Sequence, residues 1–294
     1  MSTTANTVKR LWQLPGEAVT VKFKSLLKRL RPVIYFPHQF EQGFYIVAKS
    51  YSTDGEPDIV GLPIPPKDLW LGYGRTNEEY LSWGREDFEN MTKINLSTNF
   101  RFEVGNRILD FGCGAGRMIR WFNSLAEECE IWGLDVSASC IIWCQQNLSP
   151  PFNFATVTTV PCLPFEDGYF DFIYCGSVFT HIDYMADAWL LELKRIIRPN
   201  GRIYVTVCDK HCVDLIINHP NRVPPYLRKL LLSWDARKHF TTTDFDMFSI
   251  FSGSPRSQVF YDIDYLCRRW GRMLNVISVT EEAYSYQTAI LLEK

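Results

Sequence analysis

The glycine-rich segment at residues 109–116 constrains the fold of this chain more than any other feature. An apolar run that ends at Phe111 is followed by glycines at alternate positions, 112, 114 and 116. Glycine reaches positive φ values freely and lets a ligand approach the backbone closely, because it has no Cβ. Residues 117–125 then show helical periodicity, so the segment predicts a strand that turns tightly into a helix.

Strands and helices alternate through the rest of the chain. Apolar runs predict strands at residues 107–111, 130–135, 152–157, 170–175 and 201–207. Helical patterns lie between them, at residues 117–125, from the N-cap candidate Ser137 to about 147, and at 184–197. This alternation is typical of a parallel sheet with helices on both faces. Two final runs, 273–279 and 286–292, are too close for a crossover helix and should pair antiparallel. The expected fold class is α/β: a doubly wound, mostly parallel, Rossmann-like sheet of seven strands with the last strand antiparallel.

Before residue 105 the alternation of strand and helix patterns is absent, because prolines and glycines divide the sequence into short segments. We therefore expect residues 1–104 to form an N-terminal extension and cap with helical parts, and residues 105–294 to form the main domain. Within that domain, residues 209–262 fit no βα unit and predict an insertion that covers the substrate. A helix is expected in it near residues 225–235.

Composition indicates an ordinary globular protein. The 294 residues are 46% hydrophobic and 22% charged, and no apolar run approaches the ~20 residues that span a bilayer. A secretory signal is not evident, so a cytoplasmic location is expected. The nine cysteines include no Cys-x-x-Cys pair and predict reduced core residues. A metal site at the i,i+4 pairs Cys140/Cys144 and Cys208/Cys212 is the alternative, but these pairs lack His or Cys partners at suitable spacing, so no metal is expected.

Charge is distributed unevenly along the chain. Residues 1–31 hold seven basic side chains against one acidic one, and the remaining residues hold 24 against 32, a net charge of −8. Apolar residues between 19 and 30 recur at helical spacing, which predicts a short amphipathic helix with a cationic face. Basic residues 9–31 could therefore contact a membrane surface or an acidic partner, although a solvated helix or a tail is the simpler interpretation.

The order of the glycines distinguishes between cofactors. A dinucleotide fingerprint would need a third glycine at position 117, which is arginine. The pattern Asp110-x-Gly-x-Gly-x-Gly116 instead resembles the first motif of class I S-adenosylmethionine-dependent methyltransferases. The resemblance extends over residues 105–294, through Leu163-Pro-Phe-Glu-Asp-Gly-Tyr-Phe-Asp171 and Arg198-Pro-Asn-Gly201. Ser177-Val-Phe-Thr-His181 is similar to the signature of one branch of the family. The resemblance implies S-adenosyl-L-methionine as cofactor.

The resemblance also implies a set of cofactor-binding residues. The backbone of the glycine segment would pass along the methionine part of the cofactor, and Asp110 would hold the amino group. Asp135, at the end of a strand, would accept hydrogen bonds from both ribose hydroxyls, which a carboxylate can do; a solvated aspartate is the alternative. No acidic residue stands among residues 158–162 to meet the adenine, so backbone and apolar contacts are expected there. The predicted cofactor-binding residues are Asp110, Gly112, Cys113, Gly114, Gly116, Asp135, Val136 and Ser177.

His181 is the candidate catalytic residue. It follows the fourth strand, and its ordinary pKa suits a base at neutral pH that removes a proton from the acceptor. A packing role is the alternative. Tyr73 and Arg75, in an aromatic segment before the domain, and His211, after the fifth strand, are the candidate substrate-binding residues. Core packing explains the aromatic residues equally well.

The predicted function is transfer of a methyl group to an oxygen or nitrogen of a small molecule or sugar unit. A catalytically silent cofactor-binding or scaffold protein and a protein methyltransferase are the alternatives. A nucleic-acid substrate is disfavoured, because the domain is acidic and no Asn/Asp-Pro-Pro-Tyr motif follows the fourth strand.

Overall fold

The chain divides into two compact units, Met1–Tyr51 and Ser52–Lys294. The computed structural model describes the backbone of residues 33–35 and 45–47, and residues 57–223, 227–229, 246–250, 252 and 257–294. In the first unit, β1 (Val33–Tyr35) pairs antiparallel with β2 (Tyr45–Val47). The predicted amphipathic helix at 19–30 lies outside the described residues. The predicted domain boundary at residue 104 stays a prediction.

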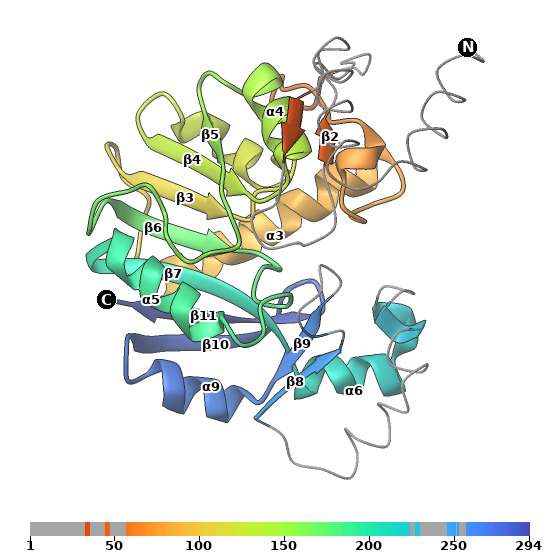
Figure 1. Ribbon diagram of the computed structural model, residues 1–294, viewed down its shortest axis with the longest axis vertical. Helices are drawn as coiled ribbons and strands as arrows, with labels where there is room; N and C mark the ends of the chain where they lie inside the picture. The colour runs from red at the N-terminus through yellow and green to blue at the C-terminus, as the bar shows by residue number, and fades with distance from the viewer. Residues whose placement is uncertain are drawn as a thin grey trace, which may run out of the picture. The chain divides into compact units, whose positions relative to one another are not determined.

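The second unit is built on a mixed sheet with the strand order β10-β11-β7-β6-β3-β4-β5, which Figure 1 shows from β10 below to β5 above. Strands β3 to β7 run parallel, and β11 lies antiparallel between β7 and β10. This arrangement confirms the predicted α/β fold and its antiparallel last strand. The strands of this path are β3 (Arg107–Phe111), β4 (Glu130–Asp135), β5 (Asn153–Thr156), β6 (Phe170–Cys175), β7 (Ile197–Asp209), β10 (Asn275–Tyr284) and β11 (Gln287–Glu293).

Two further strands extend the predicted set of seven. The last residues of β7, Cys208 and Asp209, pair in parallel with β9 (Gln258–Tyr261), and β9 pairs antiparallel with β8 (Met247–Ile250). The predicted insertion thus adds a two-stranded piece to the edge where the parallel strands end. Its expected helix near 225–235 lies mostly outside the described residues.

Helices cover both faces of the sheet, as the alternating side chains of β6 show. Phe172 and Tyr174 point to the face on which Phe122 packs, 5.8 Å from the Tyr174 ring. Residues Ile173 and Cys175 point to the opposite face and belong to the apolar core with residues of α5 and α9. The helices are η1 (Lys67–Leu69), α3 (Asn77–Ser97), η2 (Ile119–Leu125), α4 (Ala138–Asn147), α5 (Ala186–Ile196), α6 (Lys210–Asn218), η3 (Pro220–Arg222) and α9 (Ile263–Trp270).

Several boundaries differ from the sequence prediction by a few residues, and two of the differences change the type or the start of an element. The helix expected at 117–125 is a 3-10 helix that begins at Ile119. The fifth strand begins at Ile197 instead of 201, because Ile197 already pairs with Phe170 across an irregularity in the β6–β7 register. The turn residues Arg198–Gly201 are therefore part of a bulged strand start. Among the described helices, none is both long enough and apolar enough to cross a membrane.

Candidate active site

The carboxyl ends of β3, β4, β6 and β7 meet at one edge of the sheet, where an open α/β fold binds its ligands. The hairpin of β10 and β11 returns to the same edge, since Thr288 at the start of β11 pairs with Val207 near the end of β7. Residues from distant parts of the sequence thus surround the segment that comes after β3.

The glycine segment is fastened to the end of β4 by its backbone. The N–H groups of Gly112 and Cys113 donate to the carbonyl oxygen of Leu134 at 2.7 and 3.0 Å. The Gly114 N–H donates to Asp135 Oδ2 at 2.8 Å. These bonds hold the glycine segment across the carboxyl ends of β3 and β4 and fix the orientation of its three amides.

Positive φ angles explain why glycine is needed at two of these positions. Gly112 has φ +90°, and a Cβ there would stand 2.2 Å from Val178 Cγ2. Gly114 has φ +52°, and a Cβ there would meet Leu71 Cδ1 at 3.2 Å. Side chains at either position would be strained, because L residues avoid this backbone region. Gly112 therefore lets Val178 pack directly against the backbone of the segment. At Gly114 no side chain projects from the segment.

The Asp135 carboxylate accepts hydrogen bonds from backbone amides on both of its oxygens. Its Oδ1 accepts from the Ser137 N–H at 2.7 Å, and its Oδ2 accepts from Gly114. Burial raises the pKa of this carboxyl, and the backbone hydrogen bonds oppose the rise. A carboxylate has about four acceptor positions, so Asp135 can accept from a further donor. Val136 follows with 56% of its surface exposed.

Asp110 lies buried at the end of β3. Burial raises its pKa to about 8; the neighbouring Tyr174 hydroxyl and the Arg117 guanidinium lower it, and the Asp135 carboxylate raises it. The free protein therefore holds Asp110 largely protonated at neutral pH. A cation placed beside it would favour the carboxylate form.

A buried arginine cluster adjoins the glycine segment. Arg117 Nη2 lies 2.7 Å from Asp87 Oδ2 on α3 and contacts the Tyr284 hydroxyl at the end of β10. The Tyr73 ring stacks on this guanidinium, with 4.0 Å between Cζ and the ring centroid. The Tyr73 and Tyr284 hydroxyls are 3.4 Å apart. The N-terminal segment and the C-terminal hairpin thus meet on Arg117.

The other two candidate substrate-binding residues lie apart from this cluster. Arg75 is exposed, and its backbone binds the Glu79 carboxylate at 2.7 Å and the Lys67 ammonium at 2.8 Å. His211, in the first turn of α6, faces Glu282 Oε1 at 3.0 Å and Glu281 Oε2 at 3.5 Å.

His181 is exposed and oriented by the insertion. Its Nδ1 is 2.7 Å from the carbonyl oxygen of Ser257, next to β9. The backbone beside it is tied down as well, because the Val259 N–H donates to the Thr180 oxygen at 2.8 Å and the Tyr261 hydroxyl donates to the Ile182 oxygen at 2.6 Å. A carbonyl can only accept, so Nδ1 carries the proton in the neutral ring and Nε2 is then the acceptor nitrogen.

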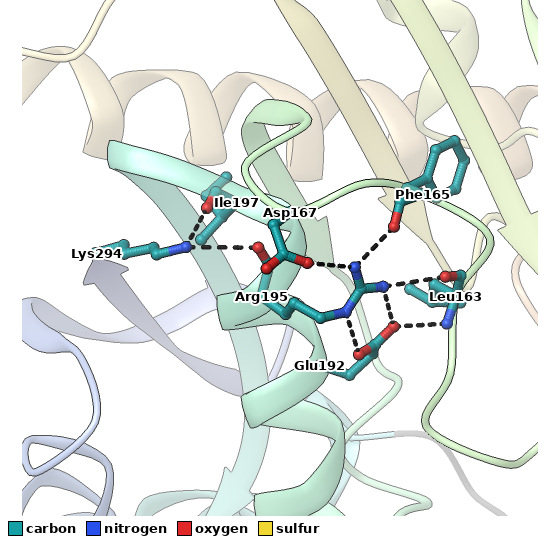
Figure 2. Close-up of polar contacts among 7 residues, drawn as sticks. All are labelled: Leu163, Phe165, Asp167, Glu192, Arg195, Ile197 and Lys294. Atoms are coloured by element: carbon teal, nitrogen blue, oxygen red, sulfur yellow. Dashed lines mark hydrogen bonds and ion pairs between the residues drawn. The ribbon is translucent and has the colours of Figure 1, made fainter.

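The loop between β5 and β6 is held by two side chains of α5, drawn in Figure 2. Arg195 donates to the carbonyl oxygens of Leu163 and Phe165 at 3.0 and 2.7 Å and to Asp167 Oδ1 at 2.8 Å. Glu192 binds the same guanidinium and accepts from the Leu163 N–H at 2.6 Å. These bonds fix the loop that comes after residues 158–162, where the adenine contacts are expected.

The cysteines and acidic residues of the described part of the chain form no metal centre. No group of three or more His, Cys, Asp or Glu side chains there could hold an ion. All nine cysteines are free thiols, and most of them are buried.

The structure thus gathers most of the predicted residues at one edge and adds residues that the sequence analysis missed. Those additions are buried side chains with polar groups: Asp87, Arg117 and Tyr284, which contact one another, and Thr206 on β7 and Gln287 at the start of β11, which both bond Ser177. A polar residue opening the apolar run of β11 was the available signal for Gln287, and an arginine directly after the glycines was the signal for Arg117.

Comparisons with known proteins point the same way as the site. The family described as "Methyltransferase domain" matches residues 109–205. The uncharacterized methyltransferase YcgJ of Bacillus subtilis is 28% identical over 141 residues, which are 45% of this chain and 54% of that protein. The ubiquinone/menaquinone biosynthesis C-methyltransferase UbiE of Cupriavidus metallidurans is 29% identical over 112 residues, 36% of this chain and 44% of that protein.

A solved structure shares the fold. The PH0226 protein of Pyrococcus horikoshii has a TM-score of 0.50 and 14% identity, over 75% of this chain and 94% of that one. The matched regions of the curated relatives are partial, since the chain spans about half the length of those named above.

Proposed function

We propose that this chain, whose residues 109–205 match the family described as "Methyltransferase domain", is a class I S-adenosylmethionine-dependent methyltransferase that transfers the cofactor's methyl group to an oxygen or nitrogen of a small molecule or sugar unit. The observation that carries the proposal is the fastening of the Gly114 amide to Asp135 at the carboxyl ends of β3 and β4. This bond places the backbone of Gly114, which carries no side chain, beside the hydrogen-bond-accepting carboxylate of Asp135.

The residues at this edge fit the cofactor's chemistry. Asp135 lies at the carboxyl end of β4 and is a hydrogen-bond acceptor, as ribose hydroxyls require. The exposed Val136 side chain offers an apolar surface for the adenine. The methionine part would lie along Gly112, Cys113, Gly114 and Gly116, with its ammonium at Asp110. When bound, S-adenosylmethionine supplies an electrophilic methyl group on a sulfonium.

His181 is the proposed base. An acceptor hydroxyl or ammonium must lose a proton as the new bond forms. The Ser257 carbonyl at 2.7 Å fixes the tautomer in which Nε2 takes up that proton. Because the ring is exposed at the carboxyl edge, Nε2 can meet a bound acceptor.

The acceptor side is assigned to Tyr73, Arg75 and His211. Tyr73 is the best supported of the three, since its ring and hydroxyl are fixed against Arg117 and Tyr284. Ser177, at the end of β6, is assigned to the cofactor side. A small acceptor is favoured because α3, the segment before β9 and the hairpin all bring residues to this edge, and the acidic charge of residues 32–294 disfavours nucleic acid. Contact of basic residues 9–31 with a membrane or partner remains a proposal, and these residues lie outside the described part of the chain.

The test is transfer of a deuterated methyl group. The protein is incubated with methyl-deuterated S-adenosylmethionine and a metabolite extract, and mass spectrometry searches for small molecules that gain one labelled methyl. A labelled product that requires the protein, and that falls strongly with His181→Ala, is expected. The Asn218→Ala variant is the control, since its side chain donates to Asp214 on the exposed side of α6.

Two other results would redirect the proposal. Cofactor binding without a labelled product in small-molecule or protein fractions would favour a silent scaffold. Label appearing in protein bands alone would favour a protein methyltransferase.

A further inference from the structure

A closed ring of hydrogen bonds joins Ser177 to two neighbouring strands. The Ser177 N–H donates to Thr206 Oγ1 at 2.7 Å, and the Thr206 hydroxyl donates to Gln287 Oε1 at 2.7 Å. Gln287 Nε2 closes the ring by donating to Ser177 Oγ at 2.9 Å. The direction of each bond is fixed, because a backbone N–H can only donate and a hydroxyl has one proton to pass on.

Burial makes this ring rigid. Thr206 on β7 is fully buried, and Gln287 at the start of β11 is 2% exposed. A buried amide or hydroxyl that lost its partner would have no water to replace it, so the three members depend on one another. Ser177 is the one member assigned above to the cofactor side, whereas Thr206 and Gln287 make none of the contacts assigned to cofactor or acceptor.

The ring acts on a residue with an unfavourable backbone. Ser177 has φ +59°, in the left-handed region that residues other than glycine rarely adopt. Such a conformation persists when the surroundings hold it, and here both the N–H and the side chain of Ser177 are held.

The conformation of Ser177 sets the path of the next four residues. Val178 comes directly after it and packs on the glycine segment, so closely that a Cβ on Gly112 would stand 2.2 Å from Val178 Cγ2. The Val178 carbonyl then accepts from the His181 N–H at 2.9 Å. A change of φ at Ser177 would therefore move the contact with the glycine segment and the histidine loop together.

We propose that Gln287 is a positioning residue of the cofactor site: with Thr206 it holds Ser177 in the left-handed conformation and so seats Val178 against Gly112. The inference rests on the proposed function, since its effect is read as cofactor affinity. Gln287 itself touches neither cofactor nor acceptor and acts through Ser177.

The first test is calorimetric titration of Gln287→Leu with S-adenosylhomocysteine. Leucine fills similar space but removes both bonds of the amide, so affinity should fall about tenfold, within the range expected when a strained conformation loses its support. Unchanged affinity would overturn the inference. Gln145→Leu is the matched control, because it removes one amide bond, to the Phe154 oxygen at 2.9 Å, away from the ring; its affinity should stay within about twofold of wild type.

The second test separates positioning from packing. Glycine adopts the left-handed conformation without support, so the Gln287→Leu change should lose most of its effect in a Ser177→Gly background, to less than about twofold. An equal tenfold loss in both backgrounds would mean that Gln287 acts by packing, and the inference would be wrong.

Two safeguards keep the outcome interpretable. If Gln287→Leu does not fold, Thr206→Val breaks the ring from the other side and should give the same loss, with the same rescue by Ser177→Gly. Failure of the wild-type protein to bind S-adenosylhomocysteine would reject the proposed function itself. Normal wild-type binding with unaffected ring variants would reject the inference alone.

Discussion

The two halves of the site are built in different ways. The half at β3 and β4 is made by backbone: amides of the glycine segment bond Leu134 and Asp135, and the residues involved lie within 24 positions, from Gly112 to Asp135. The half at β6, β7 and the hairpin is made by side chains: Arg117 with Asp87, Tyr73 and Tyr284, and Ser177 with Thr206 and Gln287. The first half is therefore local in sequence and is the half to which we assign cofactor binding, whereas the second half joins distant segments of the chain.

The largest effect is expected from breaking the second half at Arg117. Arg117→Met leaves the buried Asp87 carboxyl without its partner, 2.7 Å away in the native protein. The free energy of unfolding should fall by about 3–5 kcal/mol, as for other buried pairs that lose one member. Chemical denaturation measures it. Arg85→Met is the matched control: it removes an exposed pair with Glu89 on α3 and should cost less than about 1 kcal/mol. Equal losses in the two variants would mean that the buried Arg117 pair does not hold the second half together.

A substitution in the first half should affect binding more than folding. Gly114→Val places a branched side chain at φ +52°, on the surface where the cofactor would lie. Affinity for S-adenosylhomocysteine should fall about 100-fold or more, equivalent to at least about 2.7 kcal/mol, while the protein stays folded. Calorimetry and circular dichroism measure the two properties.

The control for this variant is Gly105→Val. Gly105 has φ +83°, but a Cβ there meets no atom within 4 Å. The variant therefore carries a similar backbone strain at a distance from the ligand surface. Loss of cofactor binding in Gly105→Val would show that strain, and not contact, explains the result at Gly114.

Proton release on binding tests the role of Asp110. Burial raises the pKa of this carboxyl to about 8 in the free protein, so at pH 7 it is mostly protonated, and the proposed contact with the cofactor's ammonium requires it to ionise. Binding at pH 7 should release close to one proton, and affinity should rise up to about tenfold per pH unit as pH approaches 8. The same raised pKa makes ionisation oppose folding, so the stability of the free protein should decline as pH rises between about 4 and 8.

Calorimetry in buffers of different ionisation enthalpy measures the released proton. Asp110→Asn should release none. Identical buffer dependence in wild type and Asp110→Asn would place the titrating group elsewhere.

The smallest effect is expected at the loop between β5 and β6. Arg195→Met removes bonds to the carbonyl oxygens of Leu163 and Phe165, on a side chain that is one-third exposed. Stability should fall by about 1 kcal/mol, with a loss of affinity of less than about threefold. Thermal unfolding and the same titration measure both. Arg198→Met, which removes a single pair with Asp171, is the control; a larger loss there would mean that the bonds in Figure 2 do not fix the loop.

The same contrast explains how much the sequence could predict. Strands at 107–111, 130–135 and 170–175 were predicted to the residue, because buried parallel strands are short apolar runs bounded by turn residues. The antiparallel hairpin followed from the short link between its strands. Placement of the glycine segment beside Asp135 also follows from strand order, since β3 and β4 are neighbours in sequence and in the sheet.

Other features could not be predicted from one sequence. The ring joins residues 177, 206 and 287, and no periodicity relates positions so far apart. The burial of Arg117 could not be predicted either, because its partners lie far away in sequence, on α3 and at the end of β10. The bulged start of β7 was assigned to a turn, because Arg198-Pro-Asn-Gly201 carries turn residues and strand pairing overrides them.

A crystal structure of the protein with S-adenosylhomocysteine is the decisive measurement for the cofactor site. We expect the ribose hydroxyls on the two oxygens of Asp135, the homocysteine part along Gly112 to Gly116, and Ser177 still in the left-handed conformation. A ligand bound elsewhere, or a saturated crystal with this edge filled by the chain's own side chains, would contradict the proposed function.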